Sequence, residues 1–311
     1  MKIIIFFLTF SLITIKAQIS GVAFYNYNYN LSDKISGPEK NSFSLDRVYF
    51  TYKSIISDEL SFTFQTDVGN VGDDERLTTY LKKAQLIWKG PFNISLGMQG
   101  MNMFNVKEKT WGFRFIEKSP MDKHKFSSSA DMGLGISGNN NNLSYNFLIT
   151  NGSGYKKQET DAYKKTSVQF VYGKKRLNEN YGFNLGTNIS NEPYSKNNVI
   201  NVISFFSGFS NKKIRFGGEY DLKIDTGIDE TERITAFYSS YQLNEKLEGL
   251  IYFDSYNSNV KTINNSENYI ILGFNYYPTK GFIVSPNLRM IFFEDEIEGE
   301  RILKINFQFK F

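Results

Sequence analysis

Basic side chains are concentrated in one segment of the sequence, residues 102–127. It carries six positive and three negative side chains. The positive ones are Lys107, Lys109, Arg114, Lys118, Lys123 and Lys125. Ammonium and guanidinium groups around a narrow passage favour anions, because their field is strong where little water screens it. The segment therefore predicts attraction of anions, with the alternative that its charges pair with acidic residues along a wet wall.

Groups suited to covalent catalysis or metal binding are scarce. The chain has no cysteine and a single histidine, His124, which lies in the same basic segment. A serine nucleophile needs a base beside it, and nothing in the sequence distinguishes a working pair among the 32 acidic residues. We therefore expect no enzymatic activity, no cofactor and no bound metal.

The first 17 residues have the features of a secretory signal peptide. Lys2 precedes an apolar run from Ile3 to Ile15, and the small residue Ala17 follows. About 13 apolar residues are too few for a spanning helix, so we expect cleavage after Ala17. Loss of two lysines leaves 34 of the 36 basic residues against 32 acidic ones. This balance gives no basic excess for binding nucleic acid.

Polarity alternates with a period of two in many segments of residues 18–311, which we treat as one domain. In residues 92–98 and 143–149, for example, every second residue is apolar. The last segment keeps the pattern to its end, with Phe307, Phe309 and Phe311 on one face and Lys304 on the other. Segments of about ten residues with alternating polarity, separated by turns, are typical of transmembrane β-barrels.

We expect about sixteen strands in an all-β, antiparallel barrel. They are placed near residues 18–30, 42–55, 59–68, 78–88, 92–101, 128–137, 142–150, 166–173, 180–189, 198–209, 213–222, 233–242, 246–256, 268–277, 281–292 and 301–311. Short turns alternate with longer loops, which is typical of β-barrels in the outer membrane of Gram-negative bacteria. A secreted β-sandwich is the alternative, but it does not need outward aromatic residues at so many strand ends.

The segment 102–127 is the longest connection and the third on the long-loop side. A barrel of about sixteen strands encloses water unless something fills it. Trp111, Phe113 and Phe115 make this loop too apolar to extend into water. We therefore expect it to fold into the lumen and form a constriction; contact with a neighbouring molecule is the alternative.

Alternation also assigns further side chains to the lumen. The basic ones are Arg47, Lys83, Arg215, Arg289 and Lys304, and the acidic ones are Asp67, Glu219, Asp221, Glu248 and Asp254. The inward glycines are Gly97, Gly133 and Gly135, close to both ends of the long loop. Glycine permits close backbone approach, so we expect these three to form a floor on which the loop rests.

Three stretches, residues 43–70, 80–100 and 113–119 (FRFIEKS), resemble the sequential pattern of the phosphate-selective porin family, porins O and P. The resemblance is clearest over residues 43–137, about a third of the chain. It implies a homotrimer of sixteen-stranded barrels that pass small solutes and prefer anions. That family's phosphate selectivity depends on a ladder of lumenal arginines and a dense lysine cluster, whereas this chain has eight arginines in total.

The sequence thus predicts an outer-membrane porin, a passive channel for small hydrophilic solutes that favours anions, phosphate among them. The alternative is a closed barrel with a structural or surface-binding role. The terminal aromatic residues Phe307, Phe309 and Phe311 resemble the signal read by the outer-membrane assembly machinery. Acidic clusters at 73–75 and 294–300 suit solvated surface, or contact with lipopolysaccharide through divalent ions.

Overall fold

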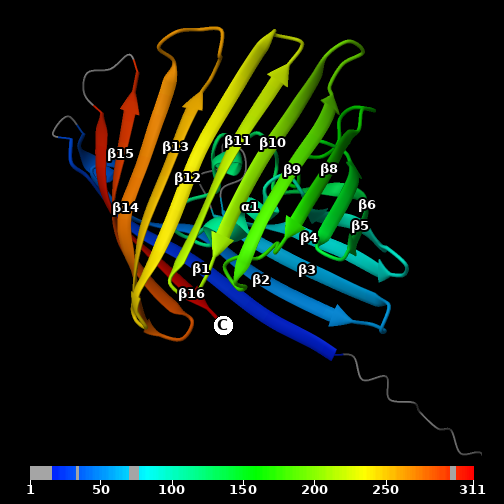
Figure 1. Ribbon diagram of the computed structural model, residues 1–311, viewed down its shortest axis with the longest axis horizontal. Helices are drawn as coiled ribbons and strands as arrows, with labels where there is room; N and C mark the ends of the chain where they lie inside the picture. Colours follow the sequence, from blue (N-terminus) through cyan, green and yellow to red (C-terminus); the bar gives the residue numbers. More distant parts are fainter. Residues whose placement is uncertain (1–15, 33–34, 70–76, 295–298) are drawn as a thin grey trace, which may run out of the picture.

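The computed structural model describes residues 16–32, 35–69, 77–294 and 299–311 (Figure 1). Sixteen strands form one closed antiparallel barrel, in which each strand pairs with its neighbours in the sequence. The barrel closes where β1 (Lys16–Asn30) pairs with β16 (Glu300–Lys310). The predicted fold class and strand number are confirmed.

The remaining strands follow in chain order. They are β2 (Asn41–Ile55), β3 (Leu60–Gly69), β4 (Thr78–Lys89), β5 (Asn93–Gly100), β6 (Ala130–Asn140), β7 (Leu143–Thr150), β8 (Lys165–Gly173), β9 (Gly182–Pro193), β10 (Val199–Ser210), β11 (Ile214–Asp225), β12 (Glu230–Asn244), β13 (Leu247–Asn257), β14 (Ser266–Thr279) and β15 (Phe282–Phe293). A short 3-10 helix, η1 (Gly37–Glu39), lies between β1 and β2. Two helices, α1 (Asn105–Trp111) and α2 (Pro120–Lys123), lie between β5 and β6.

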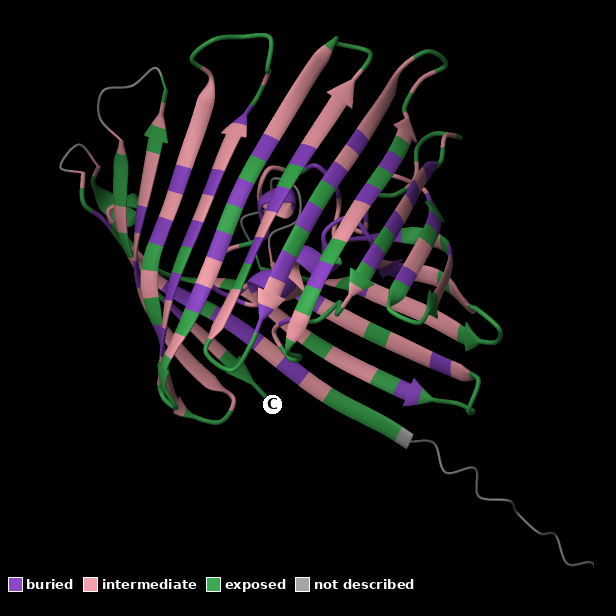
Figure 2. Cartoon of the chain, viewed as in Figure 1, coloured by how far each residue is buried: buried purple, intermediate pink, exposed green. Residues whose placement is uncertain are grey.

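The barrel exterior is apolar and the interior is polar. On β9, for example, Phe183, Leu185 and Ile189 are exposed while Asn184 and Asn188 are buried. The alternation appears as stripes along the strands in Figure 2. Buried amides beside exposed aromatic rings reverse the pattern of a water-soluble protein and fit a surface that faces lipid.

Among the residues that the structure describes, no helix is long and apolar enough to cross a membrane.

The predicted signal peptide, residues 1–17, lies almost entirely outside the described residues. Ala17 belongs to β1 and pairs with Ser54 of β2. Cleavage after Ala17 stays a prediction, and it would shorten β1 by two residues.

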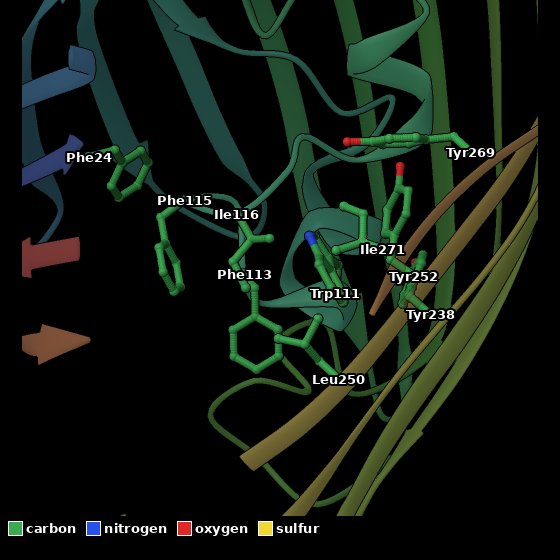
Figure 3. Packing of buried hydrophobic residues seen from close by; sticks show 10 residues of the cluster. All are labelled: Phe24, Trp111, Phe113, Phe115, Ile116, Tyr238, Leu250, Tyr252, Tyr269 and Ile271. Carbon is green, nitrogen blue, oxygen red and sulfur yellow. The ribbon is translucent and has the colours of Figure 1, made fainter. Parts of the chain in front are cut away.

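The connection between β5 and β6, residues 101–129, crosses the interior of the barrel (Figure 1). Helix α1 packs against β10 and β11, four strands beyond β6 in the order around the barrel. The aromatic residues Trp111, Phe113 and Phe115 of this connection are buried in a cluster with Tyr238 and Tyr252 (Figure 3). The lumen therefore contains a hydrophobic core that fixes this loop.

The floor expected at Gly97, Gly133 and Gly135 stays a prediction, and the closest contacts at these glycines lie within the barrel wall. A Cβ atom on Gly97 would collide with the carbonyl oxygen of Ala84 on β4, and one on Gly133 with that of Ile149 on β7. One on Gly135 would meet neighbouring strand side chains. These glycines permit close approach of adjacent strands, and Gly97 has a φ of 107°, which favours glycine.

Candidate functional site

A cavity of about 650 Å³ lies between the long loop and the wall that includes β1 to β7. Its lining includes the basic residues Lys82, Lys83, Lys109, Arg114, Arg176 and Lys310, and the acidic residues Glu108 and Glu179. A second cavity, of about 280 Å³, is lined by Arg47, Arg114, Lys118, Arg289 and Lys304 with Asp46 and Glu117. Arg114 lines both cavities, so this loop residue marks the border between them.

Strand β4 presents two consecutive lysines to the lumen because of a β-bulge. The pairing of β3 with β4 shifts at Gln65, which pairs with Lys83, whereas Thr66 pairs with Leu81. Lys82 is therefore the extra residue and points inward with Lys83. Its ammonium group donates a hydrogen bond to Ser129 and lies over the ring of Tyr155. Strict alternation found Lys83 and missed Lys82.

Lys107 is not a constriction charge, and its assignment to the passage was wrong. Its ammonium group is fully buried, 2.6 Å from Glu219 and 2.9 Å from Asp221. It also donates a hydrogen bond of 3.1 Å to Ser204. Burial opposes the charge, yet the two carboxylates outweigh it and raise the pKa of Lys107. The residue anchors α1 to β10 and β11.

The other basic residues of the loop divide into paired and unpaired groups. Arg114 lies 2.5 Å from Glu108 and 2.6 Å from Asp122, and these carboxylates raise its pKa although burial opposes this. Lys123 pairs with two carboxylates from the barrel wall. Within the described parts of the chain, Lys109, Lys118 and Lys125 form no ion pair. The alternative of charges paired along the wall thus holds for part of the predicted constriction.

The basic strand residues that were predicted to face the lumen all do so, and most of their charges are paired. Arg47 lies 3.5 Å from Asp67, Arg215 lies 3.9 Å from Glu248, and Arg289 lies 2.8 Å from Glu117. Lys83 and Lys304 form no ion pair with any described residue. Acidic residues therefore neutralise the arginines, and lysines supply most of the excess positive charge.

Arg289 and Asn306 connect the loop to the closing strands. Arg289 donates a 2.6 Å hydrogen bond to the carbonyl oxygen of Ile116, and Asn306 donates one of 2.9 Å to that of Phe115. Arg289 also contacts Glu117 and Tyr269 at 2.8 Å. Because both donors are buried, these bonds hold the loop backbone in place.

The wall at β10 and β11 makes room for α1 through two glycines that were not predicted. Gly208 on β10 and Gly217 on β11 are direct cross-strand partners. A Cβ atom on either would collide with the side-chain methyl group of Thr110 in α1. Thr110 also accepts a 3.1 Å hydrogen bond from Asn184. Facing glycines on adjacent strands are the signal that could have identified this docking point.

The turn between β8 and β9, residues 174–181, contacts α1 from the side of the barrel where the chain termini lie. It is longer than the other turns on the side of the chain termini. Leu177 is buried, and the backbone N–H of Asn178 donates a 3.0 Å hydrogen bond to the carbonyl oxygen of Lys109. The turn and α1 together fill one side of the lumen, and the cavity of about 650 Å³ lies beside them.

Replacing Gly208 by alanine is expected to lower the free energy of unfolding by about 1 to 3 kcal/mol, because the new methyl group overpacks against Thr110. Urea unfolding measures this. Gly249→Ala is the matched control, since nothing lies within 4 Å of a Cβ atom there. Adding Thr110→Ser removes the opposing methyl group and should restore part of the loss. Equal stability of Gly208→Ala and Gly249→Ala would show that the glycine is not needed for docking.

No family model matches the chain, and the search of curated proteins found no match. Solved structures do match its fold. An anion-selective porin from Comamonas acidovorans superposes with a TM-score of 0.72 at 10% identity, covering 96% of this chain and 100% of that one. OmpF of Salmonella typhi, in complex with daunomycin, gives 0.71 at 13% identity, covering 95% and 97%.

A trimer form of OmpT, an outer-membrane protein of Vibrio cholerae, gives a TM-score of 0.67 at 8% identity and covers 96% of this chain and 99% of that one. A closed sixteen-stranded barrel with an apolar exterior, a polar lumen and an internal loop defines the porin architecture. The chain has the fold of the bacterial outer-membrane porins.

Proposed function

We propose that the protein is a porin of the bacterial outer membrane that lets small hydrophilic solutes diffuse through its lumen. The supporting observation is the cavity of about 650 Å³ beside the long loop, which six basic and two acidic side chains help to line. A polar cavity on one side of the loop suits diffusion of hydrated solutes, whereas the packed side suits mechanical support of the loop.

We further propose that the channel favours anions. Three lysines of the large cavity have no carboxylate partner among the described residues: Lys83, Lys109 and Lys310. Fixed positive charge in a narrow passage raises the local concentration of anions. The resemblance to phosphate-selective porins makes phosphate the first anion to test, although lysines rather than a ladder of arginines supply the charge here.

The proposal includes the partners of such a channel. A homotrimer is supported by the family resemblance and by the trimer form of the V. cholerae protein. Phe307, Phe309 and Phe311 end the closing strand, where the assembly machinery of the outer membrane would read them. Lipid covers the apolar exterior. Contact with lipopolysaccharide was expected at residues 73–75 and 294–300, most of which lie outside the described residues.

The second candidate is a closed barrel with a structural or surface-binding role. It is favoured by one observation, the extent to which α1 and the turn at 174–181 fill the lumen around the buried Trp111 and Leu177. Conductance separates the two candidates, since a closed barrel passes no current.

Single-channel recording in planar bilayers under a salt gradient tests the proposal. We expect discrete conductance steps and a reversal potential whose sign indicates selectivity for anions. Lys83→Gln with Lys109→Gln should move that potential toward the value for no selectivity, because both ammonium groups line the cavity without a carboxylate partner. Lys125→Gln, an exposed loop lysine outside the cavity lining, is the matched control.

Each outcome has a distinct meaning. Steps without anion preference would keep the channel and remove the selectivity. No current from a folded barrel would support the closed alternative. Replacing chloride by phosphate in the same experiment tests phosphate: a reduced chloride current at low phosphate concentration would indicate a binding site, and unchanged current would contradict one.

A further inference from the structure

We propose that His124, Asp254 and Glu267 form a binding site for a divalent transition-metal ion, for which Zn²⁺ is the probe. One ligand atom from each residue lies within 4.8 Å of the other two. The residues come from three elements: His124 follows α2, Asp254 lies on β13 and Glu267 on β14. The site therefore joins the internal loop to the barrel wall.

A cation already occupies the position between the two carboxylates. The ammonium group of Lys123 lies 3.2 Å from Asp254 and 3.1 Å from Glu267. The same ammonium group lies over the ring of Tyr269. The two carboxylates are thus oriented to hold positive charge at one point, and a divalent ion would replace this single charge by a double one.

The histidine and the aspartate are held in place by neighbouring side chains. The His124 ring stacks on Tyr256 with 4.1 Å between ring centroids, and its Nε2 lies 3.0 Å from Oδ1 of Asp254. Tyr252 donates a 2.9 Å hydrogen bond to Oδ2 of Asp254. Outer partners of this kind fix ligand orientation and raise metal affinity.

The set of donors selects the kind of metal. An imidazole nitrogen and carboxylate oxygens are ligand types that Zn²⁺ accepts, and three protein ligands leave the fourth position for water. Mg²⁺ and Ca²⁺ prefer oxygen ligands alone. Glu267 is partly exposed, which leaves a route for an ion and a water molecule. Bound metal would replace the ion pairs of Lys123 by coordinate bonds from the loop to β13 and β14.

Calorimetric titration of the folded full-length protein with ZnCl₂ in detergent tests the site. Lys123→Met removes the competing ammonium group at similar side-chain size, and we expect it to tighten zinc binding at least about tenfold. His124→Phe retains an aromatic ring against Tyr256 but lacks a nitrogen ligand. We expect it to weaken zinc binding by at least about tenfold, as loss of even an outer partner does in known sites.

Glu192→Gln is the matched control. Glu192 on β9 also pairs with a lysine, Lys165 of β8, and it lies four strands away from β13. Its substitution should leave zinc affinity unchanged, and MgCl₂ should give no comparable heat with the wild type. Zinc binding that is equal in the wild type and His124→Phe would overturn the assignment. So would a folded Lys123→Met variant that binds no zinc.

Discussion

Replacing Lys107 by methionine is expected to lower the free energy of unfolding by about 3 to 5 kcal/mol, the range for breaking a buried ion pair. Lys107 is the cation between Glu219 and Asp221, and all three side chains are fully buried. Methionine has a similar length but no charge. The substitution would leave two carboxylates without a counter-charge in a region that water does not reach.

Loss of this anchor should also change conduction. Helix α1 would leave the wall of β10 and β11, and the packed side of the lumen would open. We therefore expect a larger and noisier unit conductance in bilayers, together with a lower urea midpoint. Lys125→Met is the control, because Lys125 is an exposed lysine of the same loop.

A triple variant separates charge from packing. Combining Lys107→Met with Glu219→Met and Asp221→Leu removes all three charges, and replacement of a whole buried ionic cluster by hydrophobic residues of similar volume is often nearly neutral. Most of the lost stability should then return. A single Lys107→Met variant as stable as the wild type would mean that the buried cluster does not hold α1.

The strands were predictable because the two faces of the barrel wall lie in different environments. Lipid outside and polar groups inside impose a period of two, which a single sequence displays directly. Predicted and observed strand ends agree within a few residues. The largest difference occurs at β9, which extends four residues beyond the expected segment to Pro193. β6, β11 and β12 each extend three residues beyond the expected segment at one end. There the strands continue past the alternating stretch.

Inward direction alone did not determine what each charged side chain does. Lys107 and Lys109 are two residues apart in the loop, yet one is sealed between carboxylates 112 and 114 residues away and the other lines the cavity. These distant partners depend on how the loop docks, which local polarity does not encode. The bulge that turns Lys82 inward arises from pairing with β3. In the sequence it appears as a shift of the outward apolar positions from Leu81 to Trp88, which strict alternation does not allow.

Arg289→Met is the second substitution with a large expected effect, again about 3 to 5 kcal/mol at neutral pH. Arg289 is the main counter-charge of Glu117 and also holds the carbonyl oxygen of Ile116. Its removal would leave the Glu117 carboxylate buried with Lys123 and Tyr269 as its remaining partners. Urea unfolding measures the loss.

The effect should depend on pH in a defined direction. Burial favours the neutral form of Glu117, but Arg289, Lys123 and a hydrogen bond from Tyr269 outweigh it and lower its pKa. In the wild type this group therefore adds stability above the unfolded value of about 4.3, and that contribution is lost as pH falls. Without Arg289, burial should raise the pKa of Glu117, so the destabilisation should appear as pH rises through the same value.

The difference in stability between the wild type and Arg289→Met should thus be large at pH 7 and shrink at about pH 3, below the unfolded pKa of glutamate. Adding Glu117→Gln to the variant removes the titrating group. The difference in stability between the wild type and the double variant should then change less between pH 7 and pH 3 than it does for Arg289→Met alone. A difference that is the same at both pH values in the single variant would mean that Arg289 stabilises the loop through its backbone hydrogen bond and not through Glu117.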